Sequence, residues 1–139
     1  MQSEVGRFRS VLEQLVAEGA VAARIADKTV SMWHDIDAVL SPIIGQRGVA
    51  ALYKRSLYLV RADYPWLAVV HEGALKPDEF AALQTALLQQ TSSNAATASG
   101  ALLQTFFDLL TNLIGKSLTE RLLRSVWVNT TGGNAEQDS

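Results

Sequence analysis

Apolar residues recur at spacings of three and four along almost the whole chain, which is the periodicity of amphipathic helices. Between Ser3 and Gly19 this pattern predicts one helix with an apolar face formed by Val5, Phe8, Leu12, Leu15 and Val16. From about Ala20 the pattern continues for about five turns through Val21, Ile25, Met32, Ile36 and Val39. Because strand-like alternation is rare, we expect an all-α fold, a helical bundle of five to six helices.

Proline and glycine indicate where these helices begin and end. Ser41 followed by Pro42 is typical of an N-cap and a first helical position, so a third helix is predicted from there to about Ala62. Tyr64-Pro65 disfavours further helix. The segment from 65 to 77 is therefore expected to be a surface connection, with an apolar turn at Trp66 and Leu67 tucked against the core.

The second half repeats the helical pattern. Pro77, Asp78 and Glu79 predict the start of a helix over 77–90, whose buried side is Phe80, Leu83 and Leu87. A polar turn follows, with Ser92 or Ser93 as a cap. The next apolar stripe, closed by Gly115, is formed by Ala98, Leu102, Phe106, Leu109 and Leu113. Ser117 and Glu120 have the spacing of a capping box, which predicts a last helix to about Trp127.

Two segments of the chain share a pattern. "PIIGQRGVAAL" (42–52) and "LIGKSLTERLL" (113–123) each join an apolar pair, a glycine and a second helical run. A shift of 70 aligns Leu40, Ile44, Gly45 and Leu52 with Leu110, Ile114, Gly115 and Leu122. Chance is the alternative explanation. A true repeat predicts two helix–Gly–helix hairpins around a pseudo-twofold axis, flanked by the N-terminal helix and the 77–90 helix.

Composition narrows the functional classes. The 139 residues correspond to one domain, expected over 1–128, and the polar tail 129–139 is expected to be disordered. The absence of cysteine excludes disulfides and thiolate chemistry, and a net charge of −2 argues against a nucleic-acid partner. Without a long apolar run no membrane association is expected, and the chain is predicted to be cytoplasmic. A charged fraction of only 19% favours a partner that covers apolar surface.

The segments "PIIGQRGVAALYKRSL", "YPWL" and "LIGKSLTERLL" together resemble a set of small bacterial all-helical proteins that are uncharacterised. The resemblance implies a shared fold. It implies no activity, cofactor or catalytic residue.

His34 is the first candidate for chemistry, because it lies in the middle of a predicted helix, as the phosphoryl-accepting histidine of a phosphotransfer domain does. Such domains place a lysine and a small residue after the histidine, whereas Asp35 and Asp37 follow here, so a partly exposed structural histidine beside Trp33 is favoured. His34, Asp37 and Asp27 could share one helix face and supply two or three metal ligands, but the Glu-x-x-His elements that a di-metal bundle takes from separate helices are missing, so a metal site is not favoured. We expect no metal, no cofactor and no catalytic residue.

Arg47, Lys54 and Arg61 recur every seven residues, with Tyr53 and Tyr58 nearby. This basic and partly aromatic stripe either meets phosphates or an acidic partner, or is an ordinary solvated face. Arg55 is expected nearer the Leu52–Leu59 side, paired with Glu120 or Asp108.

The leading hypothesis is a non-enzymatic interaction or oligomerisation module, either a homodimer or bound to a protein partner. One alternative is a phosphotransfer-like signalling domain that uses His34. The other is a small-ligand binder with an apolar cavity rimmed by Tyr53, Arg55 and Trp66.

Overall fold

The computed structural model describes residues 4–72 and 80–127, and every regular element in these ranges is helical. The all-α prediction is therefore confirmed, but the described residues form seven α-helices and one 3₁₀ turn, more than the five to six helices predicted. The elements are α1 (Glu4–Ala17), α2 (Ala22–Ile44), α3 (Gln46–Val60), the 3₁₀ turn η1 (Pro65–Leu67), α4 (Ala68–Glu72), α5 (Ala81–Leu88), α6 (Ser92–Ile114) and α7 (Lys116–Trp127). The predicted helix start at Pro77 and the tail 129–139 lie outside the described residues.

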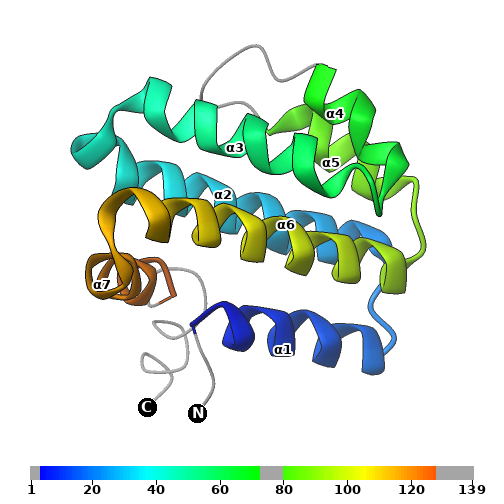
Figure 1. Ribbon diagram of the computed structural model, residues 1–139. Helices are drawn as coiled ribbons and strands as arrows, with labels where there is room; N and C mark the ends of the chain where they lie inside the picture. The colour runs from blue at the N-terminus through cyan, green and yellow to red at the C-terminus, as the bar shows by residue number, and fades with distance from the viewer. Residues whose placement is uncertain (1–3, 73–79, 128–139) are drawn as a thin grey trace, which may run out of the picture.

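The helices form three layers (Figure 1). The long helices α2 and α6 run in the same direction through the middle layer. Helices α1 and α7 lie on one side of this pair, and α3, α4 and α5 lie on the other. The two helix–Gly–helix turns, α2–α3 and α6–α7, therefore lie at the same end of the molecule.

The two halves of the chain exchange their outer helices. α1 packs on α6, which belongs to the second half, and α5 packs on α2, which belongs to the first, while α3 and α7 each contact both α2 and α6. This arrangement is the one expected of two helix–Gly–helix hairpins with flanking helices, and the pseudo-twofold axis between them stays a prediction. The symmetry is broken where η1 and α4 pack beside α3 and α5, whereas α1 and α7 contact each other directly.

The 70-residue repeat extends to the pattern of burial. Helices α2 and α6 both have 23 residues, and each buried position of α2 has a buried counterpart in α6. These pairs are Ile25 and Ala95, Ala26 and Ala96, Thr29 and Ser99, Met32 and Leu102, Trp33 and Leu103, Ile36 and Phe106, and Leu40 and Leu110. The small residues Thr29 and Ser99 are in direct contact between the two helices, through a hydrogen bond of 3.0 Å.

Glycine, and not proline, sets the boundary between α2 and α3. α2 continues through Pro42 to Ile44, so the predicted helix start at Ser41 and Pro42 is wrong. Gly45 ends α2 at φ 84° and ψ 155°, and Gly115 ends α6 at φ 93° and ψ 157°. This backbone region is essentially restricted to glycine. Pro42 therefore lies in the last turn of α2, three residues before the glycine at which the chain turns. Ser41 does not cap a helix, because its hydroxyl donates a hydrogen bond of 2.9 Å to the Asp37 carboxylate.

Two other predicted caps are wrong. Thr91, and neither Ser92 nor Ser93, caps α6, because its side chain accepts a hydrogen bond of 3.1 Å from the Asn94 amide. α7 already begins at Lys116, so no Ser117–Glu120 capping box starts it.

Two apolar positions were assigned wrongly to buried faces. Leu113, predicted in the buried stripe of α6, is 60% exposed, and Val21, predicted in the stripe of α2, is 67% exposed at the start of that helix. Both residues lie at the end of a long helix, Val21 directly before α2 and Leu113 in the last turn of α6, where neighbouring helices no longer cover the side chain.

Aromatic rings fill the core between α2, α3, α5 and α6. The Trp33 ring lies 5.1 Å from the Tyr53 ring and 5.0 Å from the Phe106 ring, both edge-on, and 6.1 Å from Phe80. Edge-to-face pairs at these separations add stability beyond the burial of their area. Leu67 is 1% exposed, so the apolar turn of the connection is packed against the core as predicted.

Candidate interaction surface

One side of α3 faces away from the bundle. Its inner side packs on α2 and α6 through buried residues that include Val49, Tyr53 and Leu57. The outer side carries exposed side chains at helical spacing, which are Arg47, Ala51, Lys54, Arg55 and Tyr58. Arg61, which follows the last turn, is half-buried beside them. We call Arg47, Lys54, Arg55, Tyr58 and Arg61 the α3 basic face.

Tyr58 organises this face. The guanidinium carbon of Arg61 lies 4.1 Å from the centroid of the Tyr58 ring, and that of Arg55 lies 5.3 Å from it. The ring is attracted to both cations, and such contacts contribute about 0.5–1 kcal/mol each at exposed sites. Tyr58 is 41% exposed, so the two guanidinium groups are held around a ring that solvent still reaches.

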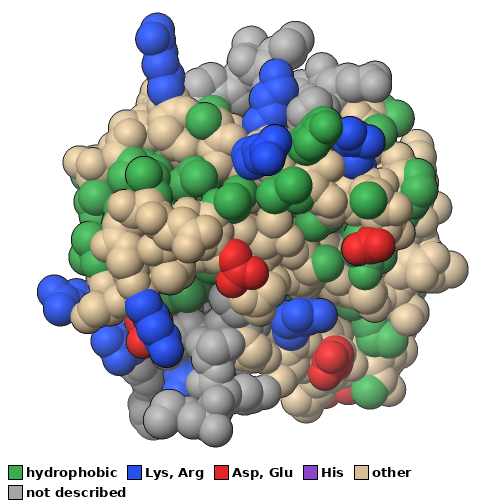
Figure 2. All heavy atoms as spheres, viewed as in Figure 1, with side chains coloured by type: hydrophobic (Ala, Val, Ile, Leu, Met, Phe, Trp, Pro, Cys, Tyr) green, Lys and Arg blue, Asp and Glu red, His purple; other side chains and the backbone are tan. Residues whose placement is uncertain are grey.

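The charge of this face is of one sign. No acidic residue occurs between Asp37 and Asp63, whereas this stretch carries four of the twelve Lys and Arg residues. In the space-filling view, one group of Lys and Arg side chains lies over α3, and the acidic side chains in view lie below it, where further Lys and Arg side chains are also seen (Figure 2). A shallow hollow of about 340 Å³ is lined by Ala51, Lys54, Arg55 and Tyr58. The α3 face is thus positive on a protein whose net charge is −2.

The structure divides the residues that the sequence analysis grouped on this helix. Arg47, Lys54 and Tyr58 lie on the exposed face, but Tyr53 is buried and its hydroxyl has no hydrogen-bond partner among the described residues. Burial raises the pKa of Tyr53 well above its ordinary value. Tyr53 is therefore a core residue.

Arg55 also departs from its prediction. Its guanidinium group lies by Tyr58, on the exposed side of α3, and it forms no ion pair with Glu120 or Asp108 within the described part of the chain. Asp108 instead accepts a hydrogen bond of 3.0 Å from Gln104 in its own helix. Only the predicted ion pair is wrong, because Leu59, which neighbours Arg55 on the helix, is itself exposed.

His34 lies away from this surface, exposed on α2, with its ring 5.0 Å from the Phe80 ring. The acids grouped with it are used elsewhere, because Asp37 accepts from Ser41 and Asp27 accepts from Gln84. Within residues 4–72 and 80–127, no three His, Asp or Glu side chains gather as metal ligands would. Phosphotransfer through His34 stays a prediction.

Trp66 belongs to a different hollow. It lines a space of about 330 Å³ between η1, α4 and α5, and neither Tyr53 nor Arg55 reaches it. The other lining residues are Val69, Ala82, Thr85, Ala86, Gln89 and Gln90. The three residues predicted to rim one ligand cavity are therefore not brought together.

Comparison with protein-family models, with curated proteins and with solved structures gives no match. Among the helices of the described ranges, none combines the length and apolar character needed to cross a bilayer.

Proposed function

We propose that this protein is a non-enzymatic interaction module that binds an acidic segment of a protein partner on the α3 basic face. The observation that carries the proposal is the position of Tyr58, exposed between Arg55 and Arg61 on a helix without acids. A tyrosine contributes a large and rigid contact area, and tyrosine and arginine are the residues that most often dominate binding energy at interfaces.

Carboxylates fit the guanidinium groups of this surface. The planar guanidinium group pairs with a carboxylate through two parallel hydrogen bonds, and stacking on Tyr58 reduces the rotamer freedom that such pairing costs. Leu59 is 40% exposed on the same helix and supplies an apolar contact for a partner side chain. A long nucleic acid would also meet the negative remainder of the protein, which disfavours it.

Fluorescence anisotropy with a labelled peptide tests the proposal. The probe is a 12-residue peptide in which Glu alternates with Leu and Ala, and its partner probe has Gln at every Glu. We expect saturable binding of the Glu peptide, at least tenfold tighter than the Gln peptide, or about 1.4 kcal/mol. Binding should weaken as salt screens the charges. Equal binding of both peptides, or tighter binding of a 12-nucleotide single strand, contradicts the proposal.

The repeat provides a matched control for mutagenesis. Lys54→Glu with Arg55→Glu reverses two charges on the α3 basic face, while Arg121→Glu with Arg124→Glu reverses two exposed charges on α7, the counterpart of α3 in the second half. Both variants change the net charge equally. We expect only the α3 variant to lose the Glu peptide. Equal loss by both variants would indicate a general charge effect and no specific site.

Self-association is the second candidate, and one observation favours it. Ile43 and Leu113 are counterparts in the repeat, they precede the two glycine turns at one end of the molecule, and they are 48% and 60% exposed. A pseudo-twofold apolar end suits a second copy of the chain, because closed dimers use self-complementary surfaces. Light scattering should give the mass of a dimer, and Ile43→Ser with Leu113→Ser should give a monomer. A monomeric mass for the unmodified chain contradicts this candidate.

A further inference from the structure

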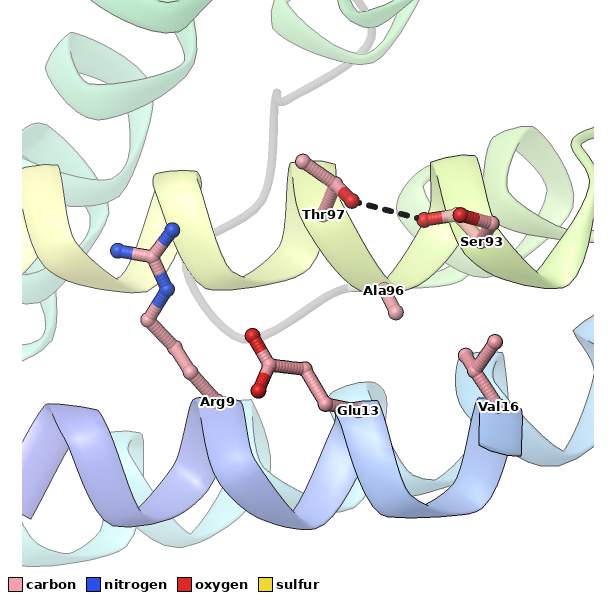
Figure 3. A pocket seen from close by; sticks show the side chains of 6 residues that line it. All are labelled: Arg9, Glu13, Val16, Ser93, Ala96 and Thr97. Atoms are coloured by element: carbon pink, nitrogen blue, oxygen red, sulfur yellow. Dashed lines mark hydrogen bonds between the residues drawn. The ribbon is translucent and has the colours of Figure 1, made fainter. Parts of the chain in front are cut away.

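A polar pocket lies between α1 and α6, on the side of the bundle opposite α3 (Figure 3). Its volume is about 180 Å³, and it is lined by Arg9, Glu13 and Val16 from α1 and by Ser93, Ala96 and Thr97 from α6. The guanidinium group of Arg9 and the carboxylate of Glu13 both extend from α1 toward α6. Opposite charges thus stand side by side along one wall of a small cavity.

Gly100 sets the position of Arg9. A β-carbon at position 100 would lie 2.9 Å from Nε of Arg9, closer than real β-carbons come to other atoms, and 3.0 Å from its Cγ. The arginine side chain therefore lies across the bare backbone of α6, and it is half-buried there. An alanine at this position would displace the side chain.

The repeat offers a comparison for the crossing of α1 with α6, because the equivalent crossing in the other half is bridged by a side-chain hydrogen bond. The crossing of α5 with α2 is the counterpart of the crossing of α1 with α6. A shift of 71 places Leu12 and Glu13 of α1 on Leu83 and Gln84 of α5, and both leucines are buried. Gln84 donates a hydrogen bond of 3.0 Å to Asp27, which is the counterpart of Thr97. Side chains of the two helices thus bridge that crossing.

No such bridge closes the first crossing. Thr97 donates its hydroxyl proton to the backbone oxygen of Ser93 at 2.9 Å. Within the described ranges, neither Arg9 nor Glu13 forms a hydrogen bond or an ion pair. A guanidinium and a carboxylate four residues apart on a helix can pair with each other. Here both remain directed into the pocket, available to a ligand.

We propose that this pocket binds a small zwitterion, with its carboxylate on Arg9 and its protonated amine on Glu13. The two charges of such a ligand complement the two charges of the wall, so the complex buries no unbalanced charge. The hydroxyl oxygens of Ser93 and Thr97 retain lone pairs that accept further N–H donors of the amine. The volume of about 180 Å³ is sufficient for a compact amino acid. This proposal uses no residue of the α3 basic face and does not depend on the function proposed for it.

Two-dimensional ¹H–¹⁵N NMR titration tests the proposal, because it reports weak binding at individual residues. The probes are glycine, alanine and 4-aminobutyrate, with acetate and methylammonium as ligands of a single charge. We expect saturable shifts of the Ser93 and Thr97 amides with at least one zwitterion, with a Kd on the order of 1 mM. The single-charge ligands should bind at least tenfold more weakly. If acetate binds as tightly, or if no zwitterion gives saturable shifts, the proposal is wrong.

Variants separate recognition from folding. Arg9→Gln and Glu13→Gln should each weaken binding at least tenfold, and Gly100→Ala should weaken it by moving Arg9. The matched control is Gln84→Ala, which alters the closed crossing and should leave the affinity unchanged. The dispersion of the same NMR spectra shows whether each variant is folded. Unchanged affinity in folded Arg9→Gln and Glu13→Gln would overturn the assignment.

Discussion

Thr29 Oγ1 donates a hydrogen bond of 3.0 Å to Ser99 Oγ, and the two residues are 70 positions apart. Because the repeat also has a period of 70, Thr29 and Ser99 occupy equivalent positions in the first and the second half of the chain. A contact between such counterparts lies on the pseudo-twofold axis. Both side chains are fully buried, so this bond satisfies polar groups at the centre of the molecule.

Replacement of one partner should cost more than replacement of both. In Thr29→Val the Ser99 hydroxyl loses its buried partner, so we expect the free energy of unfolding to fall by about 1–3 kcal/mol. Thr29→Val with Ser99→Ala removes both polar groups, and we expect it to lose less than the sum of the single changes by about 1 kcal/mol. Urea denaturation measures all three variants. Strict additivity would indicate that the bond carries no coupling.

The glycine turns should be intolerant of alanine for reasons of backbone alone. Nothing lies within 4 Å of a β-carbon built at Gly45 or Gly115, so the positive φ is the only obstacle. We expect Gly45→Ala and Gly115→Ala each to cost about 1–3 kcal/mol in unfolding free energy. The control is Gly48→Ala, whose β-carbon would meet only the Ile44 side chain at 3.2 Å in a helical backbone. It should be near neutral because alanine favours helix.

Tyr53→Phe should stabilise the protein, and increasingly so at alkaline pH. At neutral pH the change removes a buried hydroxyl without a partner, for a gain of about 1 kcal/mol. Because burial raises the pKa of Tyr53 in the folded state, the unfolded chain loses this proton first, near its ordinary pKa of 10.0. The stability of the unmodified protein should therefore fall as the pH rises above that value, by up to about 1.4 kcal/mol per pH unit.

Lys28 changes the pH dependence of stability in the opposite direction, and it is present in both the unmodified protein and Tyr53→Phe. Burial, then the charge of Arg24, lowers the pKa of Lys28, against a raising effect of Asp35. The unfolded chain therefore keeps this proton longer, and stability gains as pH rises toward 10.5, the ordinary pKa of lysine. Denaturation of the unmodified protein and Tyr53→Phe side by side, between neutral and alkaline pH, isolates Tyr53. Parallel stability curves would contradict the assignment.

The connection between the halves should contribute to stability through its buried turn. Leu67→Ala removes a side chain that is 1% exposed and should cost about 2–5 kcal/mol. Val69→Ala removes apolar atoms two residues later, at a position that is 70% exposed, and should change stability by less than about 0.5 kcal/mol. Thermal unfolding followed by circular dichroism measures both. Equal effects would mean that η1 is not part of the core.

The sequence was most informative where periodicity and backbone chemistry agree. Apolar spacing predicted the helices. Gly45 and Gly115 indicated the repeat, because the positive-φ backbone that ends α2 and α6 needs glycine. Helix starts were predicted poorly. Ser41-Pro42 has the composition of a helix start but lies within α2, since a local preference for a cap is weaker than the packing that extends the helix to Ile44.

The candidate site was predicted only in part. Arg47, Lys54, Tyr58 and Arg61 were recognised from their spacing, but that spacing does not reveal that Tyr58 lies between Arg55 and Arg61. The pocket with Arg9 and Glu13 was missed, because it forms only when the N-terminal helix crosses the other half of the chain. The signal available beforehand was Gly100, a residue that costs helix stability within a long apolar stripe.

Because outer helices are exchanged, neither half of the chain forms a complete hydrophobic core by itself. A cut between the halves would release two fragments whose apolar faces each lack their cover, so they should recombine with each other or aggregate, and not persist as separate domains. Damage in either half should accordingly melt the whole molecule in one cooperative step.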